Sequence, residues 1–169
     1  MAALRFKPSL TVAAVIEDQA RPGWFLLVEE HTPEGLRLNN PAGHVEQGES
    51  PVDAVGREVL EETGCRFQAA AFLGVYLARF QRQDPPDDVT YVRLAYSGTV
   101  EQAQPQRALD DGIVRTVWMH ADDIRACSDR HRSPLVWRCI EDHLSGRHFP
   151  LDVVVAHGSL QQAFQLRPD

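Results

Sequence analysis

The chain has 169 residues, of which 43% are hydrophobic and 24% charged, and its formal net charge is −7. These values are typical of a single globular domain with a sizeable core. The negative charge argues against a protein that holds a nucleic acid polymer by bulk attraction. The apolar runs are of strand length and too short to span a bilayer.

The cysteines and histidines give no sign of a disulfide framework or a zinc site. Cys65, Cys127 and Cys139 are scattered, and we interpret them as reduced thiols of a cytoplasmic protein. The apolar run after Arg5 and Lys7 meets acidic residues at once, so it predicts a strand rather than a signal peptide. The seven histidines lack zinc-ligand spacing, so any metal should be a hard cation held by oxygen.

In the first half of the chain, strand patterns precede a helix. Apolar runs at 10–16 and 24–28 predict two strands, joined by a turn that contains Pro22. Residues 31–46 are rich in proline and glycine and predict a loop. A helix is expected at about 51–63.

This helix has clear signals at both ends. Ser50 is a good N-cap, Pro51 suits the first helical position, and Gly64 is a natural left-handed stop. One face is apolar and should pack against the core, whereas the other carries three acids. The expected buried residues are Val52, Val55, Gly56 and Val59.

In the second half of the chain, predicted strands are again followed by a helix. Residues 70–80 and 90–98 predict strands, separated by a polar loop at 81–88. Residues 113–119 predict another strand, and residues 121–127 a short helix.

A last helix should begin at Ser133 and Pro134 and end before Gly146. We expect residues 1–154 to form one domain and residues 155–169 a C-terminal tail. The order of elements predicts an α/β (α+β) fold, with a mixed β-sheet sandwiched between α-helices. The inner face of the last helix should consist of Leu135, Cys139, Ile140 and Leu144.

The acids of the helix at 51–63 create an electrostatic problem. Glu61 and Glu62 follow Glu58 by three and four residues, so each pair repels by about 0.2–0.5 kcal/mol. Both also lie at the helix end where the dipole is negative. A solvated helix face is the ordinary interpretation. However, the preceding loop contains Gly43 and Gly48, which allow close backbone approach, and a divalent cation bridging to phosphate oxygens would offset the repulsion.

These residues also form a known motif. The pattern is Gly43-x5-Glu49-x7-Arg57-Glu58-Val59-x-Glu61-Glu62-x-Gly64. It matches the Nudix box, so the chain resembles the Nudix hydrolases, which act on a diphosphate linked to another group. The resemblance implies the Nudix fold, a mixed β-sheet between α-helices. The last position of the box is usually aliphatic and is Cys65 here, a small departure because a buried thiol behaves as a hydrophobe.

The resemblance assigns expected roles to individual residues. Arg57 matches the arginine that orients a carboxylate, and Glu49 the acid that braces the loop against the helix. The implied cofactor is Mg²⁺, with Mn²⁺ as a substitute. The implied metal ligands are Glu58, Glu61 and Glu62, completed by a backbone carbonyl at Ala42 or Gly43.

Over about residues 6–154 the chain also resembles the NudJ-type phosphatases, bacterial Nudix enzymes of broad pyrophosphate specificity. Their substrates include nucleoside di- and triphosphates and hydroxymethylpyrimidine pyrophosphate, a precursor of thiamine pyrophosphate. Leu38 stands where these relatives are expected to have an aromatic residue, which weakens the case for base stacking there. The similar segments are FKPSLTVAAV, FLLVEE, NNPAGHVE, RSPLV and SGRHFPLDVV.

Several residues outside the box are candidates for the site, each with an ordinary alternative. Arg93 would reach a substrate phosphate or be an exposed strand arginine. His44 would serve the substrate or face solvent, and Arg132 would line the pocket or only begin a helix. Asp110 and Asp111 lie near the place of an extra acid in many Nudix proteins, or form a turn.

The leading hypothesis is a Mg²⁺-dependent phosphohydrolase of small diphosphate compounds. The alternatives are an ADP-ribose or dinucleoside polyphosphate pyrophosphatase, and a non-catalytic nucleotide-sensing domain. We expect a small-molecule diphosphate as partner, no nucleic acid polymer, no membrane, and a monomer or homodimer.

Overall fold

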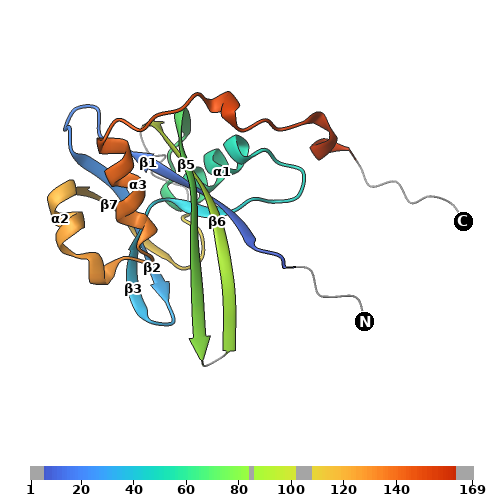
Figure 1. Cartoon of the computed structure of the whole chain (residues 1–169). Helices are drawn as coiled ribbons and strands as arrows, with labels where there is room; N and C mark the ends of the chain where they lie inside the picture. Colours follow the sequence, from blue (N-terminus) through green and yellow to red (C-terminus); the bar gives the residue numbers. More distant parts are fainter. Residues whose placement is uncertain (1–5, 84–85, 102–107, 163–169) are drawn as a thin grey trace, which may run out of the picture.

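The computed structural model describes residues 6–83, 86–101 and 108–162, and its strands form two sheets (Figure 1). In the larger sheet only β1 and β6 run parallel, so the predicted mixed α/β architecture is confirmed. The larger sheet has the order β4 (Ala42–His44), β1 (Ser9–Ile16), β6 (Pro86–Val100), β5 (Phe67–Gln83). The smaller, antiparallel sheet has the order β3 (Gly35–Asn39), β2 (Trp24–Thr32), β7 (Ile113–His120).

Two helices pack on opposite faces of the larger sheet (Figure 1). Successive residues of a strand point to opposite faces, so β1 serves two cores. Val12 and Ala14 pack with α1 (Pro51–Thr63), whereas Val15 packs with α3 (Leu135–Leu144). The other helical segments are α2 (Ala121–Ala126) and the short turns η1 (Ser128–Arg130), η2 (Leu151–Val153) and η3 (Gly158–Gln161).

Helix α1 begins and ends as predicted. The Ser50 hydroxyl accepts a hydrogen bond from the Asp53 N–H, and Gly64 has φ 71° and donates its N–H to the Leu60 carbonyl. The buried face also agrees at its centre. Val55 and Val59 are fully buried, while Val52 and Gly56 are only half-buried.

The predicted loop at 31–46 is wrong. Strand β2 continues to Thr32, and the segment then forms β3 and β4. Strand β3 pairs with β2 and β4 pairs with β1, which lies far back in the sequence. Proline and glycine mark the turns here, but pairing with distant strands determines what lies between them.

The predicted polar loop at 81–88 is also wrong for the described residues. Strand β5 extends to Gln83 and β6 starts at Pro86, so only 84 and 85, outside the described residues, separate them. The resulting long hairpin projects beyond the rest of the molecule (Figure 1). Polar side chains did not interrupt these strands, because each backbone satisfies the other's hydrogen bonds.

Helix α3 begins at Leu135, one residue after the Pro134 expected in its first turn, although the Ser133 hydroxyl still accepts a bond from the Leu135 N–H. Its inner face is as predicted for Leu135, Cys139 and Ile140, which are buried. Leu144, the last residue of α3, was expected there but is 48% exposed. The predicted tail at 155–169 includes η3, and residues 163–169 lie outside the described part.

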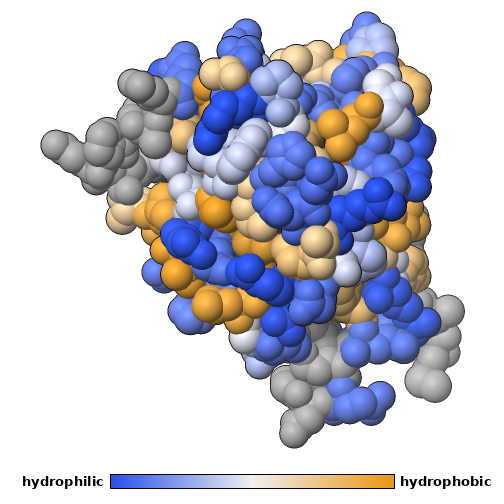
Figure 2. Space-filling view, turned by 90° about the vertical axis from the view of Figure 1, so that its left-hand side faces the viewer, coloured by the Kyte–Doolittle hydropathy of each residue, from blue (hydrophilic) through white to orange (hydrophobic). Residues whose placement is uncertain are grey.

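The surface is mixed in character. On the face turned to the viewer in Figure 2, hydrophobic patches are interrupted by hydrophilic side chains. No helix in the described ranges is long and apolar enough to cross a membrane.

Candidate active site

Glu58 projects from α1 onto the backbone of β4. A Cβ atom added to Gly43 would lie 2.1 Å from the Glu58 carboxyl carbon, so the carboxylate occupies the space that a side chain would need. The Glu58 side chain is buried, and burial raises the pKa of its carboxyl, which the neighbouring Arg57 opposes. Glycine at position 43 therefore lets Glu58 reach β4.

Glu62 lies one helical turn further along and is also buried. Its Oε2 accepts a hydrogen bond of 2.8 Å from the Ala42 N–H. Burial, together with the charges of Glu58, Glu30 and Asp110, raises the pKa of Glu62 to about 8 despite this bond. The second buried acid is thus costly to ionise in the metal-free protein.

Arg57 connects the loop before α1 to the acids on it. Its Nε and Nη2 donate to both oxygens of Glu49, at 3.1 and 2.6 Å, and Nη2 also donates to the His44 carbonyl at 2.9 Å. Its Nη1 donates to Glu58 at 2.8 Å and to Glu61 at 3.0 Å. Hydrogen bonding to Glu49 above all raises the pKa of Arg57, and the same bonds hold the pKa of Glu49 below its usual value.

Further acids lie close to this helix edge. The Asp110 N–H donates to the Glu61 carbonyl at 3.0 Å, so the start of the β7 segment is attached to α1. The charge of Asp110 raises the pKa of both Glu58 and Glu62. Asp110 therefore lies beside the acids of α1. Its Oδ1 also accepts a hydrogen bond from the Asp111 N–H, which agrees with the alternative that these two residues form a turn.

The donor set suits a hard divalent cation. Two buried carboxylates with raised pKa values would become easier to ionise beside a cation, and Mg²⁺ prefers carboxylate and carbonyl oxygens. Among the described residues, no three acidic, histidine or cysteine side chains already form a metal site. Glu62 is bonded to Ala42, whereas Glu58 and Glu61 share Arg57. The metal role of these residues stays a prediction.

Gly43→Ala should lower kcat by at least about tenfold, because the new methyl group would displace the Glu58 carboxylate. A displacement on the scale of 1 Å costs roughly a hundredfold in other enzymes. The matched control is Gly56→Ala in α1, where nothing lies within 4 Å of the added Cβ. It should keep activity and raise the melting temperature, because alanine is about 1 kcal/mol better in a helix. Equal activity in the two variants would contradict the proposed role of the Gly43 contact.

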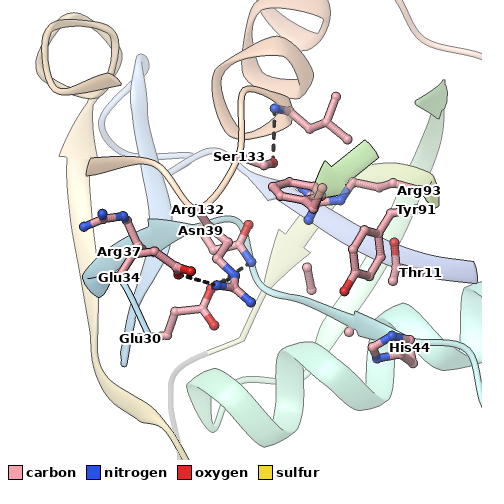
Figure 3. Close-up of a pocket in the computed structure, with 14 residues that line it drawn as sticks. Thr11, Glu30, Glu34, Arg37, Asn39, His44, Tyr91, Arg93, Arg132 and Ser133 are labelled. Carbon is pink, nitrogen blue, oxygen red and sulfur yellow. Dashed lines mark hydrogen bonds and ion pairs between the residues drawn. The ribbon is translucent and has the colours of Figure 1, made fainter. Parts of the chain in front are cut away.

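Beside the acids lies a cavity of about 440 Å³, lined by Ala42, Gly43 and residues from both sheets (Figure 3). Its floor follows from strand register. Thr11 of β1 pairs with Arg93 of β6 on one side and with His44 of β4 on the other, so the three lie in one row on one face. Gly43, the neighbour of His44 on β4, points to the opposite face and meets Glu58, so the cavity and the acids adjoin at β4.

Arg93 brings a buried, partly unpaired guanidinium to this cavity. Its side chain is buried, and Nη1 has no hydrogen-bond partner among the described residues. Burial lowers the pKa of its guanidinium, which the neighbouring Cys139, Glu30 and Glu62 oppose. Because a buried unpaired donor costs about 1–3 kcal/mol, this atom is poised for a ligand acceptor.

The other two predicted substrate residues also line the cavity. His44 is exposed and lies on the same side as Tyr91, whereas Arg132 lies on the opposite side with Asn39 and Glu30 (Figure 3). Arg132 is 3.8 Å from Glu30. The structure thus brings together Arg93, His44 and Arg132, which come from three separate segments.

The sequence interpretation missed several lining residues. Thr11, Asn39, Phe80 and Tyr91 all face the cavity, and the Thr11 hydroxyl and Asn39 Oδ1 have no hydrogen-bond partner in the described structure. The only available signal was alternation: Tyr91 is two residues before Arg93 and shares its face. Glu30 was missed because it lies between the predicted strand at 24–28 and the predicted loop at 31–46, whereas β2 continues through it to Thr32.

Comparisons with known proteins show the family of this chain. A family model described as NUDIX domain matches residues 7–138. Phosphatase NudJ of Escherichia coli (strain K12) is 36% identical over 149 residues, which cover 88% of this chain and 92% of that protein. A solved NUDIX hydrolase from Nitrosomonas europaea is 45% identical, with a TM-score of 0.79, over 90% of this chain and 99% of that one. A second from the same organism, 16% identical with a TM-score of 0.65 over 86% and 77%, shows the fold alone.

Proposed function

This chain belongs to the NUDIX family of hydrolases, and on that premise we propose that it is a Mg²⁺-dependent phosphatase of small diphosphate compounds. Its substrates would be nucleoside di- and triphosphates and hydroxymethylpyrimidine pyrophosphate. The terminal phosphate of the substrate would be released as orthophosphate. The named relative is a phosphatase, which supports release of orthophosphate.

One observation carries the proposal. The cavity of about 440 Å³ begins at Ala42 and Gly43, the two backbone positions that contact Glu62 and Glu58. A terminal phosphate placed at this end would lie beside the acidic edge of α1, and the rest of the compound would fill the cavity. The volume falls within the usual range for small-molecule sites, about 300–1,000 Å³.

In this proposal Glu58, Glu61 and Glu62 would hold the divalent cation, with a carbonyl at Ala42 or Gly43. When bound, the cation would neutralise phosphate charge and make water a better nucleophile. A carboxylate of α1 accepts a proton from the attacking water. The water oxygen then bonds to the terminal phosphorus while the bond to the bridging oxygen breaks.

The remaining residues orient these groups. Arg57 fixes Glu58 and Glu61 by its 2.8 and 3.0 Å bonds and is itself fixed by Glu49. The Nη1 of Arg93 would donate to a phosphate oxygen, which gives this atom the acceptor that it lacks among the described residues. The proposal therefore accounts for a donor without a partner in the described part of the chain.

The test is a comparison of initial rates with Mg²⁺ for nucleoside diphosphates, hydroxymethylpyrimidine pyrophosphate and ADP-ribose, with products identified by phosphorus NMR. We expect orthophosphate from the first two and little turnover of the third. The N. europaea hydrolase, which is 45% identical, can be assayed alongside for comparison. Strong preference for ADP-ribose with release of AMP would overturn the substrate proposal, and no turnover of any diphosphate would overturn the enzymatic one.

A further inference from the structure

Three rings form a continuous aromatic wall along one side of the cavity. Phe80 and Tyr91 are in edge-to-face contact with centroids 5.5 Å apart, and Tyr91 and His44 lie 6.2 Å apart. All three line the cavity. We call Phe80, Tyr91 and His44 the aromatic wall.

The wall follows from the register of the long hairpin. Tyr91 pairs with Ala78, and Ala78 and Phe80 share a face of β5, so the two rings are diagonal neighbours. On this face of β5, the core that packs under α3 ends at Ala78, which is half-buried. The next residue of β5 on the same face is Phe80, and its side chain is 39% exposed. The rings are thus more than an extension of the core, because they face an open cavity.

Polar groups surround the space beside the wall. Arg93 lies two residues after Tyr91 on the same face, and the side chains of Asn39 and Arg132 lie across from Tyr91 (Figure 3). Asn39 Nδ2 donates to Glu30 at 3.1 Å, which leaves its Oδ1 directed elsewhere and without a partner in the described structure. A flat ring with hydrogen-bonding atoms on its rim would satisfy both the rings and these groups.

We propose that the aromatic wall stacks the heteroaromatic ring of the substrate, and that Tyr91 is the main contact. The inference rests on the proposed function and assigns the residues that recognise the nitrogen heterocycle shared by the proposed substrates. The diphosphate lies at Ala42 and Gly43, and the ring lies against Tyr91, with its rim toward Asn39.

The proposal corrects the earlier expectation based on Leu38. Leu38 is 1% exposed and belongs to the core with Phe25 and Leu27, so it faces no ligand. Its aliphatic character therefore says nothing about ring binding. Aromatic residues for this purpose come instead from β5, β6 and β4.

The experiment measures binding of two non-hydrolysable ligands by calorimetry in Mg²⁺. One is the α,β-methylene analogue of ADP, which carries a ring, and the other is methylenediphosphonate, which does not. The readout is the ratio of the two dissociation constants. Base stacking contributes about 1–3 kcal/mol, so Tyr91→Leu should reduce the advantage of the ring-bearing ligand by about fivefold to a hundredfold.

Two variants serve as controls and one as a second test. Tyr91→Phe keeps the ring and should retain most of the ratio, and Leu77→Ala changes a 65% exposed residue on the other face of the same hairpin and should leave it unchanged. Phe80→Leu should reduce the ratio, which keeps the test valid if Tyr91→Leu misfolds.

Three results would overturn the inference: a wild-type protein that binds both ligands equally, an unchanged ratio in both leucine variants, or a reduced ratio in Leu77→Ala. Because no hydrolysis is measured, these results are separate from the rate screen. A protein that hydrolyses ring-free diphosphates as well as nucleoside diphosphates would keep its proposed function and lose the aromatic wall as a specificity element.

Discussion

Glu62→Gln is expected to lower kcat at least about a hundredfold while raising the melting temperature of the metal-free protein. Glutamine is nearly isosteric, and its carbonyl can still accept the 2.8 Å bond from the Ala42 N–H. At a pH above about 8, what it removes is a buried charge near Glu58, Glu30 and Asp110. Activity and stability should therefore change in opposite directions.

The stability gain should depend on pH. The folded-state pKa of Glu62 is about 8, above its ordinary value of 4.5, so the folded protein holds this proton more tightly than the unfolded one. Its contribution to stability is present below pH 4.5 and is lost as the pH rises through about 8. In EDTA, the wild type and Glu62→Gln should melt at similar temperatures at pH 5, and the variant should be the more stable at pH 8.5.

Glu61→Gln should show a similar loss of kcat with a level melting temperature, because the Glu61 side chain is 35% exposed. Glu141→Gln is the matched control, an acid of α3 whose side chain is 48% exposed, and it should change neither property. Normal kcat in Glu62→Gln, or a large fall in its melting temperature, would show that this acid serves the fold.

Removal of divalent ions by EDTA is expected to abolish turnover without unfolding the chain. Glu58 and Glu62 contact β4 at one edge of α1, whereas Ala54, Val55 and Val59 on another face of the helix pack in the core. Burial of that apolar face does not depend on a cation. The far-ultraviolet circular dichroism signal should therefore stay constant while activity falls to background.

Added Mg²⁺ should restore activity, with Mn²⁺ as a substitute, and should raise the melting temperature by binding the folded state. Gly43→Ala is a useful companion, because a displaced Glu58 should weaken this thermal shift. Full activity in EDTA would contradict the metal mechanism, and loss of the circular dichroism signal would contradict the separation of site and core.

The extended β5–β6 hairpin shows where inference from the sequence ended. Residues 81–88 are polar and contain prolines, which are local signals for a loop. The backbone is paired as far as Gln83 with Pro86, and this pairing presents Phe80 and Tyr91 to the cavity. Strand pairing depends on the partner as well as on local preference, so the aromatic wall was not visible in either segment alone.

The acids of α1 also show which features are local to the sequence and which depend on strand pairing. Their spacing on α1 was readable, since caps and a period of 3.6 residues are local properties. The sequence could not show that Glu62 is buried against the Ala42 N–H, or that Glu58 occupies the space beside Gly43. Both contacts require β4 to pair with β1, and that pairing is absent from the local pattern.

By itself, the sequence determined α1 with its caps, the positions of its three acids, the mixed α/β architecture and the resemblance to a hydrolase family. Tertiary structure alone decided that Thr11, Arg93 and His44 share a row, that Tyr91 lies beside them, and that Leu38 is core. The difference lies in how far apart in the sequence the interacting residues are. Caps and helix periodicity act within a few residues, whereas the cavity is built from β1, β4 and β6, whose neighbouring residues are up to about eighty positions apart in the chain.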